Sequence, residues 1–227
     1  MTSLFAPTLI LHITCGLAAC VVGLAPIFTR KGSQAHRLAG RAFVALMGTL
    51  LACAWLMTAL KFSAYFLALS ATATMTLFSG VRVLGRKRPD LRRSDRARPL
   101  DWIVTLGVVG VGVWVLVLVL TGRTGHLAAV SSALAYGALA YGGWDLWRFA
   151  RPTDWPFSPN LWNYEHLTKM LGAYGAVLAA FSGNFLTFLP APWSQLWPSI
   201  LFQTVTLIWI AVLIVRRRRA SVFASAG

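Results

Sequence analysis

The stretch LDWIVTLGVVGVGVWVLVLVLT, from Leu100 to Thr121, carries one charged residue, Asp101. At about 1.5 Å of rise per residue, a helix of this length crosses the hydrocarbon core of a bilayer, which is about 30 Å thick. Stretches like this make up much of the chain, because 57% of its residues are hydrophobic and only 12% are charged. A soluble domain usually has about 25% charged residues, so the composition indicates an integral membrane protein.

Other apolar stretches of similar length surround this one. Together, seven predicted spans cover roughly residues 4–28, 38–60, 62–84, 100–121, 125–149, 164–189 and 195–215. In a bilayer core the backbone has no water to hydrogen-bond with, so each span should be an α-helix. The loops between the spans are too short to fold separately. We therefore expect an all-α fold, a single seven-helix transmembrane domain over residues 1–227.

The basic residues alternate between the two ends of the predicted spans. All of them except Lys61 and Arg123 lie in or beside the first, third and fifth connections, or in the C-terminal run Arg216–Arg219. Lys and Arg collect on the cytoplasmic side of membrane proteins, so this distribution predicts an external N-terminus and a cytoplasmic C-terminus. The net charge of +15 then reflects topology and attraction to anionic lipid head groups, and nucleic acid is not an expected partner.

The three cysteines, Cys15, Cys20 and Cys53, all fall within apolar stretches, and no CxxC spacing occurs. Free cysteine behaves as a small buried hydrophobic residue. We therefore expect neither a disulfide nor a metal site from the cysteines.

The sixth predicted span begins with charged residues and ends with an amide. Glu165 and Lys169 are four positions apart with the acid first, which favours an ion pair along one helix. His166 and Asn184 lie about five turns apart on one line of that helix. Polar groups in a membrane avoid lipid, so this line should face the interior of the bundle.

The predicted topology sorts the polar side chains into two layers. The cytoplasmic layer consists of His36, Arg37, Arg41, Asp145, Arg148, Glu165, His166 and Lys169. The outer layer consists of His12, His126 and Asn184. Asp145 has Arg148 or the arginines of the second span as candidate partners. Two interpretations of the cytoplasmic layer stay open: a functional site, or a salt-bridged rim that locks the helix ends.

The first predicted span has a strip of small residues beside a histidine. Gly16, Cys20 and Gly23 follow His12 on nearby helical positions. Small residues let helices pack closely, and they also leave room for a flat cofactor or a quinone ring. A histidine within a span is a candidate site residue. Both uses of the strip stay open at this point.

Several short motifs occur in a recognisable order. They are H-x3-G-x6-G (His12, Gly16, Gly23), HR-x2-GR (His36, Arg37, Gly40, Arg41), Gly-x-Arg (Gly80, Arg82), Asp145, and EH-x3-M-x3-Y with AF-x2-N (Glu165, His166, Met170, Tyr174, Ala180, Phe181, Asn184). With these motifs, over most of its length, the chain resembles a family of bacterial multi-pass membrane proteins, domain of unknown function 2306. The resemblance implies a bacterial inner-membrane location and candidate site positions, but no particular reaction.

The leading functional hypothesis is a redox protein that binds haem b or a quinone. Its candidate cofactor-binding residues are His12, His36 and His166, and the polar residues grouped with them are Arg37, Arg41, Asp145, Glu165 and Asn184. Bis-histidine haem ligation needs two imidazoles at one depth on facing helices. His36 and His166, both in the cytoplasmic layer, meet the condition on depth. His12 and His126 meet it only roughly, since His12 lies about 10 Å deeper.

Three alternatives stay open. A small transporter would use the polar groups as a substrate path, although the spans show no inverted repeat. A zinc hydrolase would need three His or carboxylate ligands, and His36, Asp145, Glu165 and His166 could supply them although no HExxH motif occurs. A non-catalytic accessory subunit would need none of these side chains for chemistry.

Overall fold

The computed structural model describes residues 2–153, 160–186, 188–190 and 192–224, and the side chains of residues 4–216 within these ranges. Every regular element in this part of the chain is a helix, which confirms the predicted all-α fold. Five helical segments are long and apolar enough to cross a membrane, namely Leu4–Phe28, Gln34–Leu60, Ala64–Gly85, Arg93–Leu120 and Trp193–Arg216.

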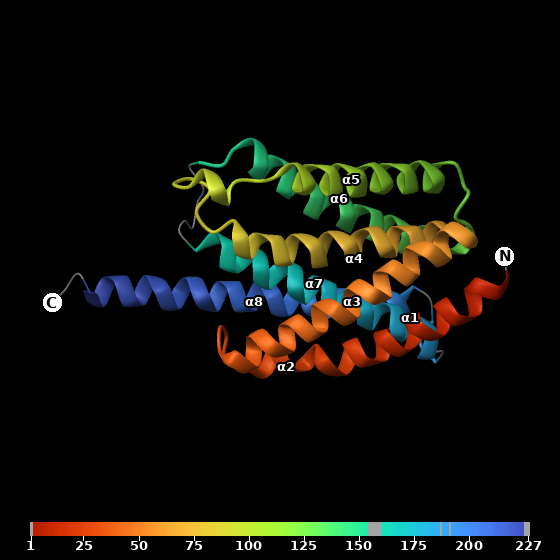
Figure 1. Ribbon diagram of the computed structural model, residues 1–227, viewed down its shortest axis with the longest axis horizontal. Coiled ribbons are helices and arrows are strands. Elements are labelled where there is room, and N and C mark those ends of the chain that lie inside the picture. The colour runs from red at the N-terminus through yellow and green to blue at the C-terminus, as the bar shows by residue number, and fades with distance from the viewer. Residues whose placement is uncertain (1, 154–159, 187, 191, 225–227) are drawn as a thin grey trace.

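The described ranges contain eight α-helices (Figure 1). They are α1 (Thr2–Val22), α2 (Leu24–Phe28), α3 (Gln34–Leu60), α4 (Ala64–Arg82), α5 (Pro99–Leu120), α6 (Ala128–Ala150), α7 (Leu161–Phe185) and α8 (Trp193–Ala224). Short 3-10 turns lie between some of them: η1 (Val83–Gly85), η2 (Arg93–Asp95) and η3 (Gly125–Leu127). α1 and α2 meet at Gly23, which keeps right-handed helical backbone angles, so the two helices form one long segment.

Each of the stretches predicted from hydropathy contains a helix, but several ends differ. α3 begins at Gln34 because Ser33 caps it, with the Ser33 hydroxyl accepting a hydrogen bond of 3.2 Å from the His36 amide. α7 ends at Phe185, before the predicted end at residue 189. α8 continues to Ala224, well past the predicted end at residue 215. Polar residues thus extend α3 and α8 beyond their apolar stretches.

The helices pack around α4 and α7 (Figure 1). α4 contacts α3, α5, α6 and α7, while α7 also contacts α1 and α8. α5 pairs with α6 on one side of this centre, and α1 pairs with α3 on the other. The two chain ends lie at opposite ends of the long axis. The centre of the fold is therefore a pair of helices from distant parts of the sequence.

α6 and α7 are not among the segments that meet the length and hydropathy criteria for a span in the described residues. Both helices carry charged residues, and four of these, Asp145, Arg148, Glu165 and Lys169, are buried. A membrane helix can carry such residues where neighbouring helices shield them from lipid. The inward-facing charges therefore account for part of the lower hydropathy of these two helices.

α1 approaches α7 closely at Gly23. A Cβ atom at this position would lie 2.6 Å from the ring of Tyr174, so a side chain does not fit there. The Tyr174 hydroxyl donates a hydrogen bond of 2.9 Å to the backbone oxygen of Cys20. Ala173 and Val177 lie near the helical line that joins His166 to Asn184, and both are buried in the same core. The middle of this line therefore faces the interior. One end of the small-residue strip thus serves helix packing.

Candidate functional site

A cluster of charged residues is buried where α4 and α6 end and α7 begins. At its centre, the Lys169 ammonium on α7 lies 2.5 Å from the Asp145 carboxylate on α6. The hydroxyl of Ser79 on α4 donates a hydrogen bond to the Asp145 carboxylate and accepts one of 2.7 Å from Lys169. Lys169, Asp145 and Ser79 are only 2%, 1% and 1% exposed. These charges are removed from solvent and satisfied by each other.

A second buried ion pair lies beside the first. The Arg148 guanidinium on α6 donates to both Glu165 carboxylate oxygens on α7, at 3.0 and 3.3 Å, and the Trp144 indole donates to Glu165 at 2.7 Å. Glu165 and Lys169 therefore have partners on α6 rather than each other. The predicted pair along α7 was wrong, as was the pairing of Asp145 with Arg148 or with the arginines of the second span. The reason is that α6 presents an opposite charge to each of these α7 side chains.

Asp101 at the start of α5 extends the cluster to a fourth helix. Its carboxylate is 0% exposed and accepts hydrogen bonds of 2.8 and 2.9 Å from the Arg82 guanidinium on α4. Arg86 lies between the two halves of the cluster, 3.8 Å from Asp101 and 3.8 Å from Asp145. Its guanidinium also stacks over the Phe149 ring, 4.6 Å from the centroid. The cluster thus connects α4, α5, α6 and α7.

This geometry supports the salt-bridged interpretation of the cytoplasmic layer. Each buried carboxylate of the cluster faces at least one basic side chain, and losing one partner of such a pair is strongly destabilising. In the part of the chain that the structure describes, no three His, Cys, Asp or Glu side chains are grouped to hold a metal ion. Asp145 and Glu165 are engaged with cations, so they do not provide the open carboxylate ligands that a hydrolytic zinc site needs.

The two cytoplasmic-layer histidines lie near each other but outside this cluster. His166 on α7 donates from Nδ1 to the Gly80 backbone oxygen at 2.8 Å, and His36 on α3 donates from Nδ1 to the Pro26 oxygen at 3.1 Å. A carbonyl oxygen can only accept, so Nδ1 carries the proton in both rings and Nε2 is left as an acceptor. The two imidazoles are close enough to interact electrostatically.

Arg37 and Arg41 do not join the buried cluster. The Arg37 guanidinium donates to the Gly32 backbone oxygen at 2.5 Å, within the turn that precedes α3. Arg41 lies one helical turn further along and is exposed. Both arginines therefore belong to the surface of the bundle, and the partners of Asp145 and Glu165 come from other helices.

A large cavity lies at the other end of the bundle, between α1, α3, α4 and α7. Its volume is about 510 Å³. Most of its lining is apolar and includes Met47, Leu51, Ala73, Val177 and Phe181. Leu17, Phe66 and Phe185 line the cavity and are also exposed on the outside of the bundle, so the cavity opens on its lateral surface. Ligand pockets are typically apolar and of about 300–1,000 Å³.

The cavity has a few polar groups with free hydrogen-bonding capacity. His12 on α1 donates from Nδ1 to the Leu50 backbone oxygen at 3.1 Å, which leaves Nε2 as an acceptor. Ser70 on α4 is 3% exposed and lines the cavity, so its hydroxyl is a further polar group of the lining. Asn184 on α7 uses its amide nitrogen to donate to the Ala180 oxygen at 2.7 Å, which leaves its carbonyl group available.

The structure therefore brings together two of the three residues predicted for the outer layer. His12 and Asn184 both line the cavity, whereas His126 is exposed on η3 and is not among the lining residues. Gly16 also lines the cavity, and a Cβ atom there would lie 3.1 Å from the Leu50 side chain. Gly16 and Gly23 of the strip on α1 therefore both lie at close helix contacts, and Gly16 also borders the cavity.

Sequence reasoning did not select four residues of these two regions. They are Ser79, Arg86 and Asp101 in the cluster, and Ser70 in the cavity. Asp101 had a usable signal, because it is the single charge in the stretch quoted first, and an ionisable residue in a span is a candidate by default. A serine in an apolar helix carries no comparable signal, since it often bonds to its own backbone.

No family model, no curated protein and no solved structure matches this chain. The resemblance to the bacterial family named above therefore stays a prediction, and the functional argument depends on the geometry of the cavity and the cluster.

Proposed function

We propose that the chain is a seven-span protein of the bacterial inner membrane that binds a lipophilic ligand of the quinone class. The ligand occupies the cavity between α1, α3, α4 and α7. One observation carries the proposal: an apolar cavity of about 510 Å³ is lined by an imidazole acceptor on His12 and by the hydroxyl of Ser70.

The lengths of α6 and α7 support a count of seven spans. They contain 23 and 25 residues, and at about 1.5 Å per residue each is long enough to cross a bilayer core of about 30 Å. Both run along the long axis of the bundle, beside helices that qualify as spans by hydropathy (Figure 1). Their buried charges have partners inside the bundle, so lipid does not have to solvate them.

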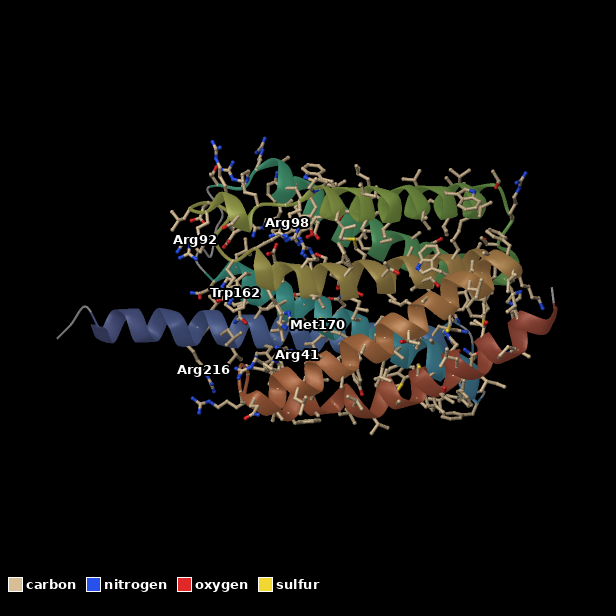
Figure 2. All side chains as sticks on the ribbon, viewed as in Figure 1. Arg41, Arg92, Arg98, Trp162, Met170 and Arg216 are labelled. Atoms are coloured by element: carbon tan, nitrogen blue, oxygen red, sulfur yellow. The ribbon has the colours of Figure 1, made fainter. Side chains whose placement is uncertain are left out.

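The positions of the basic side chains support a cytoplasmic C-terminus. In Figure 2, the labelled Arg92, Arg98 and Arg216 lie toward the end of the bundle from which the C-terminus projects. The opposite end, where the N-terminus lies, has Lys61 and Arg123 in its loops. Because Lys and Arg collect in cytoplasmic loops, the cavity then lies in the outer half of the membrane.

The groups in the cavity match the chemistry of a quinone and its quinol. A quinone ring has carbonyl oxygens, to which the Ser70 hydroxyl can donate a hydrogen bond. The hydroxyl of a quinol can donate to Nε2 of His12. The apolar walls receive the ring, and the lateral opening beside Leu17 and Phe185 receives a hydrocarbon tail directly from the bilayer.

Haem b is a second candidate for the same cavity. Met47 and Met57 line it together with His12, and histidine–methionine ligation occurs in cytochromes. His36 and His166, the pair expected to ligate haem from the sequence, are not among its lining residues. The two candidates differ in a simple measurement, because bound haem gives an intense Soret absorption band and a quinone does not.

The proposal is tested with the purified full chain in lipid nanodiscs. Binding of decyl-benzoquinone is measured by titration for the unchanged protein and for Gly16→Phe, which fills the cavity, and His12→Leu, which removes the acceptor. We expect Gly16→Phe to abolish saturable binding. The titration is repeated with the reduced quinol, because only a quinol hydroxyl can donate to Nε2 of His12. His12→Leu should weaken quinol binding by about tenfold, the effect of losing one hydrogen bond of about 1.4 kcal/mol. The lipids that copurify are identified by mass spectrometry.

His126→Leu is the matched control, since it removes an exposed histidine on η3. Its affinity should equal that of the unchanged protein. If the cavity holds only phospholipid chains and decyl-benzoquinone does not saturate, the quinone assignment is wrong. A Soret band that is present in the unchanged protein and lost in His12→Leu would assign the cavity to haem b instead.

A further inference from the structure

Five basic residues gather where α2 turns into α3 and α8 passes beside it. This basic corner consists of Arg30, Lys31, Arg37, Arg41 and Arg216, all of them exposed. The Lys31 ammonium lies over the Trp209 ring of α8, 4.7 Å from its centroid, which ties α8 to the turn. In Figure 2, Arg216 extends from α8 on the side of this turn.

The basic corner has no acidic partner among the described residues. The ion pairs found among all the described residues have other basic partners, namely Arg82, Arg86, Arg88, Arg148 and Lys169. The loop between α4 and α5 is different, because Arg88 there pairs with Asp90 at 2.8 Å and its amide donates to Asp95 at 3.0 Å. Positive charge at the corner is therefore not neutralised within the protein, whereas part of the charge in the loop is.

Several side chains of the corner are held in place before any ligand binds. The Lys31 ammonium donates to the Pro26 and Ile27 backbone oxygens at 2.6 and 2.8 Å. Arg37 is held by the Gly32 oxygen, and the turn depends on Gly32, whose φ is 77°. Desolvation lowers the pKa of Lys31 although the residue as a whole is exposed, and a nearby anion would offset this cost.

An apolar surface adjoins the basic corner. Leu24, Phe28 and Leu38 on α2 and α3 are 44%, 82% and 69% exposed. Tryptophan is enriched at the level of lipid head groups, and Trp209 lies at the corner. Cations, an interfacial ring and exposed apolar side chains at one corner suit a phospholipid, which has both a charged head group and acyl chains.

We propose that the basic corner binds the phosphate head group of an anionic phospholipid, whose acyl chains lie along the exposed face of α2 and α3. This inference rests on the membrane placement proposed above, but not on the ligand of the outer cavity. The cations of the corner recognise the phosphate by charge, and Arg37 and Arg41 add guanidinium donors that suit phosphate oxygens. A zwitterionic lipid lacks the net negative charge and should bind more weakly.

The test compares two lipids on the full chain in detergent. Phosphatidylglycerol and phosphatidylcholine with identical acyl chains are titrated separately, and native mass spectrometry counts the retained lipids. We expect the unchanged protein to prefer phosphatidylglycerol. Removing three cations with Lys31→Gln, Arg37→Gln and Arg41→Gln should reduce that preference about tenfold or more. The variant is accepted only if its thermal unfolding is unchanged, and Arg41→Gln alone is used if it is not.

A charge-matched control separates a defined site from general attraction. Arg92→Gln, Arg93→Gln and Arg96→Gln remove three cations from the loop between α4 and α5, at the same end of the bundle. This control should retain the preference for phosphatidylglycerol. The proposal would be overturned if both triple variants lost the preference for phosphatidylglycerol equally. It would also be overturned if the unchanged protein showed no such preference. If the chain instead stays monodisperse without detergent, the membrane placement itself is wrong.

Discussion

The ammonium of Lys169 on α7 and the carboxylate of Asp145 on α6 lie 2.5 Å apart, and the two residues are only 2% and 1% exposed. Neither helix is among the segments that qualify as a span by hydropathy in the described residues. The pair therefore couples two helices of the bundle at a point where neither charge has access to solvent. Its energetic role can be measured directly.

Replacing one partner of this pair should be costly. Asp145→Asn leaves the Lys169 ammonium buried without a counter-charge, and loss of one partner of a buried pair typically costs about 3–5 kcal/mol. We expect a large fall in the unfolding temperature of the protein in detergent. The control is Asp90→Asn, which removes the partly exposed partner of Arg88 at the surface and should change that temperature little.

Replacing both partners should cost less than replacing one. A double variant, Asp145→Leu with Lys169→Met, removes both charges together and keeps side chains of similar volume. Such apolar substitutions are often neutral or stabilising. Unfolding of the double variant close to that of the unchanged protein would indicate a structural pair. An unfolding temperature as low as that of Asp145→Asn would contradict this interpretation.

α4 and α7 pack most closely at Gly80. A Cβ atom at this position would lie 2.9 Å from the Met170 sulfur and 3.1 Å from the Lys169 Cβ. Gly80→Val should force these helices apart and destabilise the protein by about 1–3 kcal/mol, as overpacking does in other cores. Gly107→Val is the control, since nothing lies within 4 Å of a Cβ there. Equal unfolding temperatures for the two variants would show that the contact is not tight.

The hydroxyl of Tyr174 should contribute modestly to stability. It donates a hydrogen bond of 2.9 Å from α7 to the Cys20 backbone oxygen on α1. Interhelical hydrogen bonds in membrane proteins are worth about 0.6 kcal/mol on average, so Tyr174→Phe should cause a small fall in unfolding temperature. Tyr136→Phe alters a ring that is 71% exposed and should cause none. If Tyr174→Phe lowered the free energy of unfolding by several kcal/mol, the hydroxyl would have a second role.

The orientation of the chain is tested by labelling single cysteines. Cys15, Cys20 and Cys53 are first replaced by alanine, and a cysteine is then placed at Lys61 or at Arg92. In intact spheroplasts, a membrane-impermeant maleimide should label the Lys61→Cys variant, in the loop between α3 and α4. The Arg92→Cys variant, in the loop between α4 and α5, should be labelled only after permeabilisation. Labelling of both variants in intact cells would contradict the seven-span arrangement.

The positions of the helices could be predicted because hydropathy is a property of each stretch on its own. The long apolar stretches required helices, and helices are found there. The ends were less predictable, since they depend on local hydrogen bonds such as the Ser33 cap of α3. The extension of α8 past residue 215 likewise lies outside its apolar stretch, where hydropathy gives no information.

Partners within the buried cluster could not be predicted from spacing. The four-residue spacing of Glu165 and Lys169 is favourable along a helix, yet each has a partner on α6. Which helices are neighbours, and how each is rotated, is a property of the packed bundle. The sequence placed His12 and Asn184 in one layer, but it could not show that they share a cavity, because that depends on the gap left by Gly16 and its neighbours.

The polarity of α6 and α7 has a consequence for how the protein enters the membrane during synthesis. A single Asp, Lys or Arg adds at most about 2.5–3.5 kcal/mol to the free energy of insertion by the translocon, which is the value at the middle of an isolated helix, whereas these charges lie nearer to the helix ends. Asp145 and Arg148 emerge from the ribosome before Glu165 and Lys169, their counter-charges. In the proposed seven-span arrangement, we therefore expect α6 to remain beside α4 until α7 is made, and the two helices to be integrated as a pair.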